Sequence, residues 1–153
     1  MKVNLDYFQE GHSGESMILL PISLEADEQW SFVQSKKHQR WLWCVLGHRT
    51  HELIAYTFGP RTHSVLERLL KLLSPLHITH WFTDGLMAYR QLLDQSKHFM
   101  GKRNTQKIER FFLTLRTRIK RLARKSICFS KSVITHDTVI GLFINRYCFG
   151  RNV

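Results

Sequence analysis

Residues 104–125 read NTQKIERFFLTLRTRIKRLARK, and this stretch decides how the rest of the chain is interpreted. Its apolar residues recur at steps of 4, 3, 4 and 3 residues, which is the spacing of one face of an α-helix. They are Ile108, Phe112, Leu115, Ile119 and Leu122. The pattern predicts one amphipathic helix through the stretch, with this face buried. Glu109 falls on the flank of the buried face, on the same side as Arg116.

The positive charge of the chain is concentrated on the same stretch. Residues 102–131 hold eleven lysines and arginines and one acid, Glu109, so the net charge of this window is +10 against +11 for the whole chain. Salt bridges within the helix cannot balance such a run, and the pattern is typical of proteins that bind polyanions. We therefore predict contact with nucleic acid. The residues expected to bind DNA are Lys102, Arg103, Lys107, Arg110, Arg116, Arg118, Lys120, Arg121, Arg124 and Lys125.

Length and composition predict one domain with a substantial core, because the chain has 153 residues of which 43% are hydrophobic. The three cysteines, Cys44, Cys128 and Cys148, have the spacing of neither a disulfide framework nor a zinc site, which favours a reducing compartment. No apolar run approaches the roughly 20 residues of a membrane span, and no signal peptide is evident. We expect a soluble, cytoplasmic protein with no membrane partner.

Hydrophobic and turn patterns predict an α/β fold with the element order βββ-α-β-α-β-α. The expected strands are 24–33, 41–46, 52–58, 77–82 and 98–100, and the expected helices are 64–73, a short one through Tyr89 and Leu93, and 104–125. Thr62 or Ser64 can cap the first helix, and Ser64 with Glu67 matches a capping box. The first three strands predict an antiparallel meander, and the later alternation of helices and strands predicts a mixed sheet covered by helices. Residues 1–23 remain unassigned, as a linker or an upstream remnant.

Three acids stand where sites form in such a fold. Asp27 lies on the first expected strand, Asp84 at the carboxyl end of the fourth, and Glu109 on the last helix. Converging carboxylates repel one another unless a divalent cation neutralises them, so the arrangement predicts Mg²⁺, with Mn²⁺ as a substitute. Two such ions about 4 Å apart would suit phosphodiester chemistry.

Each acid also has a structural interpretation. Asp84 before Gly85 is typical of a turn, and Glu109 in a first helical turn favours the helix dipole. Glu28 stands beside Asp27, and in an extended strand one of the two must face away from the other.

Five motifs, in this order, resemble the InsB-type transposases of insertion sequence one. They are ADEQW at 26–30, FGPRT at 58–62, TDG at 83–85, GKRNTQKIER at 101–110, and CFSKS with HD within 128–137. These bacterial transposases use two aspartates and a glutamate on an RNase H-like fold. The resemblance covers about residues 24–149 and implies that this segment is an RNase H-like catalytic domain.

The resemblance also implies roles for individual residues. It makes Asp27, Asp84 and Glu109 the catalytic residues and metal ligands, with 24 residues between the second and the third. Arg116, seven residues after the glutamate, matches a basic residue that would grip a DNA phosphate near the cut. The implied reaction is Mg²⁺-dependent hydrolysis at transposon ends, followed by attack of the exposed 3′-hydroxyl on target DNA.

The implied partners are the DNA of transposon ends and target, and further copies of the chain. No DNA-reading module is evident before residue 24, so a separate DNA-reading protein made from another reading frame is expected to supply it. Such a bacterial protein would be associated with the nucleoid. The chain departs from the family at Phe111 and Phe112, where a polar pair is usual, and at Pro60, which replaces an acid.

Other interpretations stay open. The same basic stretch suits a truncated, non-catalytic transposase remnant that binds DNA or regulates the full-length protein. A nuclease of the RNase H type, acting on RNA–DNA hybrids, would share the fold and the acids. His136 and Asp137 resemble a proton-relay pair, but we expect a local contact at the start of a helix.

Overall fold

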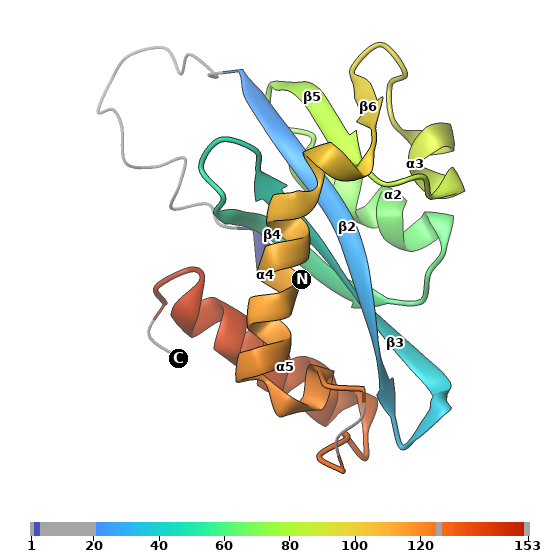
Figure 1. Cartoon of the computed structure of the whole chain (residues 1–153), viewed down its shortest axis with the longest axis vertical. Coiled ribbons are helices and arrows are strands. Elements are labelled where there is room, and N and C mark those ends of the chain that lie inside the picture. The colour runs from blue at the N-terminus through green and yellow to red at the C-terminus, as the bar shows by residue number, and fades with distance from the viewer. Residues whose placement is uncertain (1, 4–20, 125–126, 152–153) are drawn as a thin grey trace.

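The computed structural model describes residues 2–3, 21–124 and 127–151 (Figure 1). Its elements, in chain order, are β1 (Lys2–Val3), β2 (Ile22–Val33), β3 (Ser35–Gly47), β4 (Leu53–Gly59), α2 (His63–Leu73), β5 (Ile78–Thr83), α3 (Met87–Leu92), β6 (His98–Met100), a 3-10 turn (Lys102–Asn104), α4 (Gln106–Arg118), a second 3-10 turn (Lys120–Leu122) and α5 (Val133–Tyr147). No helix in these described ranges is both long and apolar enough to cross a membrane.

The described strands form one six-stranded sheet in the order β1-β4-β3-β2-β5-β6. β2, β3 and β4 pair antiparallel, which confirms the predicted meander, whereas β5 pairs parallel to both β2 and β6. β1, from the segment left unassigned, pairs antiparallel with β4. The predicted mixed α/β sheet is therefore confirmed, with one more strand than expected.

Helices cover both faces of the sheet. The alternating residues of β3 divide between two cores, because Trp43 and Val45 pack with α2 and α3 while Leu42, Cys44 and Leu46 pack with α4 and α5. All five are at most 1% exposed. A strand with a core on each side reads as a continuous apolar run, which is the pattern at 41–46.

The β2–β3 hairpin is longer than predicted. The sequence predicts strands at 24–33 and 41–46, but Ser35 already pairs with Val33, and Gln34 alone makes the turn with a φ of 64°. The strand half at 35–39 is exposed and polar, so it lacks the apolar alternation by which strands are recognised. Its backbone hydrogen bonds to β2 continue the hairpin beyond the buried part of the sheet.

The amphipathic helix is shorter than predicted. α4 ends at Arg118, Ile119 is extended with φ −113° and ψ 97°, and Leu122 lies in the second 3-10 turn. Both apolar residues are nevertheless buried, at 6% and 1% exposure, so the predicted stripe is confirmed as core. Lys125 lies outside the described residues.

α5 is missing from the predicted element order, although a helix start is expected at His136 and Asp137. Ser132 begins it, and its hydroxyl accepts a hydrogen bond from the Thr135 N–H at 3.1 Å. At α2 the expected capping box is wrong, because Thr62 is the N-cap and no side chain there makes a capping hydrogen bond.

Candidate active site

Sheet register brings the two aspartates together. Ala26 on β2 pairs with Thr83, the last residue of the parallel strand β5, so Asp27 and Asp84 are the next residues along the two chains. Asp84 turns away from the sheet there, and its Oδ1 accepts a hydrogen bond from the Leu86 N–H at 2.9 Å. The turn role and the predicted meeting with Asp27 are therefore both present in the structure.

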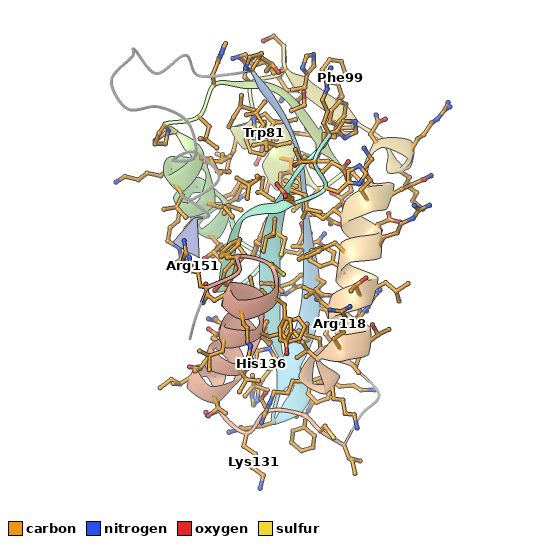
Figure 2. All side chains as sticks on the ribbon, turned by 90° about the vertical axis from the view of Figure 1, so that its left-hand side faces the viewer. Trp81, Phe99, Arg118, Lys131, His136 and Arg151 are labelled. Carbon is orange, nitrogen blue, oxygen red and sulfur yellow. The ribbon has the colours of Figure 1, made fainter. Side chains whose placement is uncertain are left out.

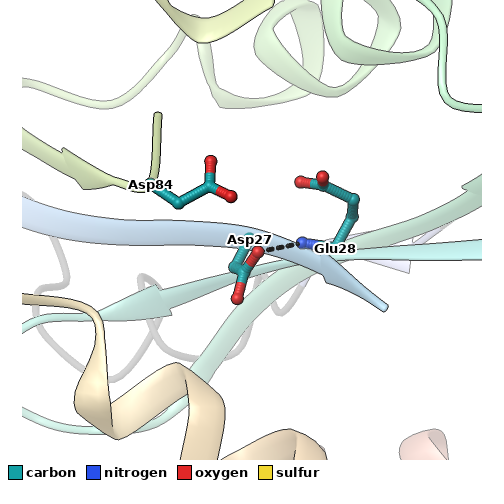
Figure 3. Close-up of side chains that lie close together, drawn as sticks. All are labelled: Asp27, Glu28 and Asp84. Carbon is teal, nitrogen blue, oxygen red and sulfur yellow. Dashed lines mark hydrogen bonds between the residues drawn. The ribbon is translucent and has the colours of Figure 1, made fainter. Parts of the chain in front are cut away.

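The aspartates form a carboxylate cluster with Glu28 (Figure 3). Each of Asp27, Glu28 and Asp84 offers one ligand oxygen, and these oxygens all lie within 4.8 Å of one another. Figure 3 shows Asp27 and Glu28 on opposite sides of the β2 ribbon, as expected for adjacent residues of a strand. Hard divalent cations prefer such all-oxygen donor sets, so the cluster fits a metal ion.

The ionisation of Asp27 reflects this crowding. Burial raises its pKa to about 7, and the negative charge of Glu28 raises it next, with smaller contributions from Asp84 and Glu109. A hydrogen bond from the Glu28 N–H to Oδ1, 2.8 Å long, partly opposes these effects. A bound cation would favour the ionised carboxylate, because its positive charge acts in the opposite direction.

Glu28 is already engaged by the protein. Its Oε1 lies 2.6 Å from Arg61 Nη2, and its Oε2 accepts a hydrogen bond from the Tyr89 hydroxyl at 2.9 Å. Burial raises the pKa of Glu28, and the bonds from Arg61 and Tyr89 counteract that rise. This carboxylate joins β2 to α3 and to the chain before α2.

Glu109 lies near the same site, on helix α4. It projects from α4, is exposed, and lines a pocket of about 250 Å³ together with Asp27 and Arg116. It lies outside the group of acids whose oxygens are within 4.8 Å of one another. The structure thus brings two of the three predicted acids together and places the third across the pocket, without a protein partner for its carboxylate among the described residues.

The predicted basic residues divide into groups. Arg116 and Arg124 line the pocket with the acids, and the Arg124 guanidinium lies 4.6 Å from the centre of the Trp30 ring. Burial, and then the charge of Arg116, lower the pKa of Arg124. Five others are exposed: Lys102, Arg103, Arg110, Arg118 and Lys120.

Two predicted DNA-binding residues have partners within the protein. Lys107 Nζ donates to the backbone oxygen of His48 at 2.5 Å, and Arg121 Nη1 donates to the Ser130 hydroxyl at 3.1 Å. These contacts tie α4 and the second 3-10 turn to neighbouring segments.

Comparisons with known proteins show the family of the chain. A family model described as IS1 transposase matches residues 20–150, which is most of the chain. The chain belongs to the IS1 transposase family. It is 53% identical over 125 residues to the insertion element iso-IS1n protein InsB of Shigella dysenteriae, covering 82% of this chain and 95% of that relative. It is 45% identical over 124 residues to the insertion element IS1 4 protein InsB of Escherichia coli K12, covering 81% of this chain and 74% of that relative.

Solved structures similar to this IS1-family chain show the fold. The catalytic core domain of BIV integrase has a TM-score of 0.51 at 12% identity, covering 86% of each chain. A chain of the simian T-cell lymphotropic virus intasome in complex with PP2A regulatory subunit B56 gamma has a TM-score of 0.54 at 18% identity, covering 92% of this chain and 53% of that chain. Integrase catalytic cores have an RNase H-like fold, so the predicted fold class is confirmed.

Two residues of this transposase-family chain were not singled out by the sequence. Glu25 is fully buried, and its Oε1 lies 2.6 Å from His48 Nδ1 while its Oε2 accepts from the Ile108 N–H. Gln29 is 4% exposed and lines the pocket. The sequence could have indicated them through the two-residue period of a strand, which places residues 25, 27 and 29 on one face.

The pair at 136–137 lies in the first turns of α5, as expected, but only one of its contacts is local in the sequence, and the others reach the β2–β3 hairpin. Nε2 of His136 lies 2.8 Å from the Ser31 hydroxyl and Nδ1 lies 2.8 Å from the Ser130 hydroxyl, while Asp137 forms a salt bridge with Arg40. Figure 2 labels His136, whose ring is fully buried between α5 and the hairpin strands. These bonds fasten the start of α5 to the hairpin.

Proposed function

We propose that this chain is a DNA transposase catalytic domain that hydrolyses a phosphodiester at transposon ends and transfers the resulting 3′-hydroxyl into target DNA. The observation that carries the proposal is the meeting of Asp27 and Asp84 at the carboxyl end of β5, in a chain of the IS1 transposase family. Sites in α/β sheets form at such strand ends. The DNA substrate is what the family implies.

In this proposal Asp27, Asp84 and Glu109 hold Mg²⁺. The metal, when bound, would activate the oxygen nucleophile and stabilise the leaving oxygen. Glu109 is the third ligand in preference to Glu28, because Arg61 and Tyr89 already occupy both oxygens of Glu28. Glu109 has no such partner among the described residues and faces the pocket from α4.

The protein side chains orient the DNA. Arg116 and Arg124 would bind backbone phosphates beside the acids, since guanidinium groups match phosphate oxygens in charge and geometry. The exposed basic residues of α4 and its flanking turns would extend this contact along the strand. No covalent bond between protein and DNA is required.

The experiment uses a branched oligonucleotide that mimics the strand-transfer product, so that recognition of transposon ends contributes little. The protein is incubated with this DNA and Mg²⁺ or Mn²⁺, and resolution of the branch is followed on a denaturing gel. Wild type should resolve it, whereas Asp84→Asn and Glu109→Gln should not, with thermal unfolding showing that both variants fold. Glu67→Gln, an exposed acid on α2, is the matched control and should keep full activity.

Equal activity in Asp84→Asn and wild type would overturn the proposal. If wild type binds the branch without resolving it at either metal, the non-catalytic DNA-binding alternative replaces it. Faster cleavage of an RNA–DNA hybrid than of duplex DNA would instead favour a nuclease of the RNase H type. Assembly into a dimer or larger complex belongs to the proposal too, because a transposon has two ends to cut.

A further inference from the structure

Gln29 is a buried polar side chain without a partner. It lies on β2, two residues after Asp27, and is 4% exposed. Within the described part of the chain, neither its Oε1 nor its Nε2 has a hydrogen-bond partner. Its backbone is held in the sheet, opposite Leu42 of β3. The position of the amide is therefore set by the strand and by packing, not by bonds of its own.

The neighbouring polar residues on this face of β2 differ from Gln29 in this respect. Glu25 binds His48 and the Ile108 N–H, and Ser31 binds the Arg40 carbonyl and His136. A buried amide that lacks hydrogen bonds destabilises a fold, and an apolar side chain of similar shape avoids that loss. This makes Gln29 an exception in a row of otherwise bonded polar groups.

Gln29 lines the pocket that contains Asp27 and Glu109, while both atoms of its amide are buried in the free protein. The pocket, of about 250 Å³, has Asp27 and Glu109 among its lining residues, together with Gln29 and the guanidinium-bearing Arg116 and Arg124. A phosphodiester in it would meet carboxylates able to hold a metal and donors able to bind its non-bridging oxygens. The amide Nε2, which is buried in the free protein, would supply one further uncharged donor on the strand that carries Asp27 once the side chain turns into the pocket.

We propose that Gln29 binds the sugar-phosphate backbone of the DNA strand that reacts at Asp27 and Asp84, with its Nε2 donating to a non-bridging oxygen of the reacting phosphate. The inference rests on the proposed function and adds a substrate-binding residue to it. Substrate would then satisfy the donor that the free protein leaves unpaired. Arg116 and Arg124 would attract the phosphate by charge, whereas the uncharged amide of Gln29 would orient it by a hydrogen bond.

The first test compares Gln29→Met, which keeps the length of the side chain and removes its hydrogen bonds, with wild type. The variant should unfold at an equal or higher temperature, because it no longer buries an unpaired amide. Its kcat/KM on the branched oligonucleotide should fall about tenfold or more, the usual effect of losing one substrate hydrogen bond. Gln39→Met, an exposed glutamine of the same hairpin, is the control and should change neither quantity.

The second test changes the DNA. A methylphosphonate at the reacting position replaces one non-bridging oxygen by a methyl group, and each of its two diastereomers is tested separately. Binding is measured by fluorescence anisotropy in EDTA, so this readout does not depend on catalysis. One diastereomer should bind wild type more weakly than the unmodified DNA, and the same diastereomer should bind Gln29→Met with little or no additional loss.

The outcomes separate this inference from the proposed function. A Gln29→Met variant that unfolds earlier yet binds and cleaves DNA like wild type would overturn the inference, since the amide would then be structural. Equal methylphosphonate penalties in wild type and Gln29→Met would overturn it as well. Neither result touches the proposed function, which is decided by the activity of wild type, its cleavage of hybrid against duplex DNA and the Asp84→Asn comparison; the EDTA binding measurement tests Gln29 even if that function fails.

Discussion

The Glu25 carboxylate on β2 accepts a hydrogen bond from the backbone N–H of Ile108 on α4, with 3.2 Å between Oε2 and N. Thr105 is the N-cap of α4 and makes no side-chain capping bond, so a strand residue satisfies a free N–H in the first turn of this helix. The charge also suits the positive end of the helix dipole. Glu109 is the next residue after Ile108, so this bond fixes the helix at the point where the proposed third ligand projects.

Replacing Glu25 should therefore lower the stability of the fold. Glu25→Ala removes a charged acceptor that is fully buried and leaves the Ile108 N–H without its partner. We expect the free energy of unfolding to fall by about 2 to 4 kcal/mol. Urea unfolding measures this free energy. The control is Glu52→Ala, which removes an exposed acid between β3 and β4. Equal urea midpoints for Glu25→Ala and the control would contradict this capping role.

Measurements of metal affinity should distinguish the role of Glu109 from that of Glu28. Calorimetric titration with Mn²⁺ is expected to show at least about a tenfold loss of affinity in Glu109→Gln, because one anionic ligand is removed. Glu28→Gln should bind Mn²⁺ nearly as well as wild type but unfold at a lower temperature, since it loses the ion pair to Arg61. The reverse pattern would show that the ligand set is the compact cluster of Asp27, Glu28 and Asp84.

His136 should make the stability of the fold depend on pH. Burial lowers the pKa of its ring, and the nearby Arg40 and Arg121 lower it further while Asp137 opposes them. The unfolded chain, with an ordinary histidine pKa of about 6.5, then binds a proton more readily than the folded chain as the pH falls. The contribution to stability is complete above pH of about 6.5 and is lost as the pH falls toward the lower pKa of the folded state.

Urea unfolding at pH 7.5 and 5.5 tests this dependence. Wild type should lose up to about 1 kcal/mol per pH unit through this group, and His136→Gln should lose less over the same interval. The comparison uses the slope with pH, because His136→Gln also changes the bonds to Ser31 and Ser130 at every pH. His38→Gln, an exposed histidine of the hairpin, should keep the wild-type slope. Identical slopes in all three proteins would show that His136 does not titrate in this range.

The parts of the fold that could be predicted are those where local pattern and tertiary structure agree. The meander follows from apolar runs separated by turns, the mixed sheet follows from the later alternation of helices and strands, and Asp84 follows from its place directly after a strand. α5 escaped prediction because its buried positions include His136 and Asn145 while Ile134 is 80% exposed, which blurs the helical period. The end of α4 could not be seen either, since Ile119 and Leu122 continue the apolar stripe beyond the helix.

The candidate site divides in the same way. Residue type and position after a strand indicate Asp27 and Asp84, but the engagement of Glu28 depends on Arg61 and Tyr89, which lie 33 and 61 residues away in the chain. Glu25 reads as one more strand acid until its partner on α4 is known, 83 residues further on. Such pairings are tertiary, and a single sequence carries no local signal for them.

DNA binding should depend on salt in a way that identifies Arg116 as a phosphate contact. Each phosphate that a cation neutralises adds about 0.9 to the slope of log affinity against log salt, because counterions leave the DNA. Arg116→Ala should therefore bind more weakly at low salt and reduce the slope by about one. Lys71→Ala, an exposed cation on α2 at the opposite face of the sheet, is the matched control for net charge. Anisotropy titrations between about 50 and 200 mM salt, in EDTA, give both slopes. A change of slope that is the same for Arg116→Ala and Lys71→Ala would mean that the overall charge of the protein, and not a contact in the pocket, attracts the DNA.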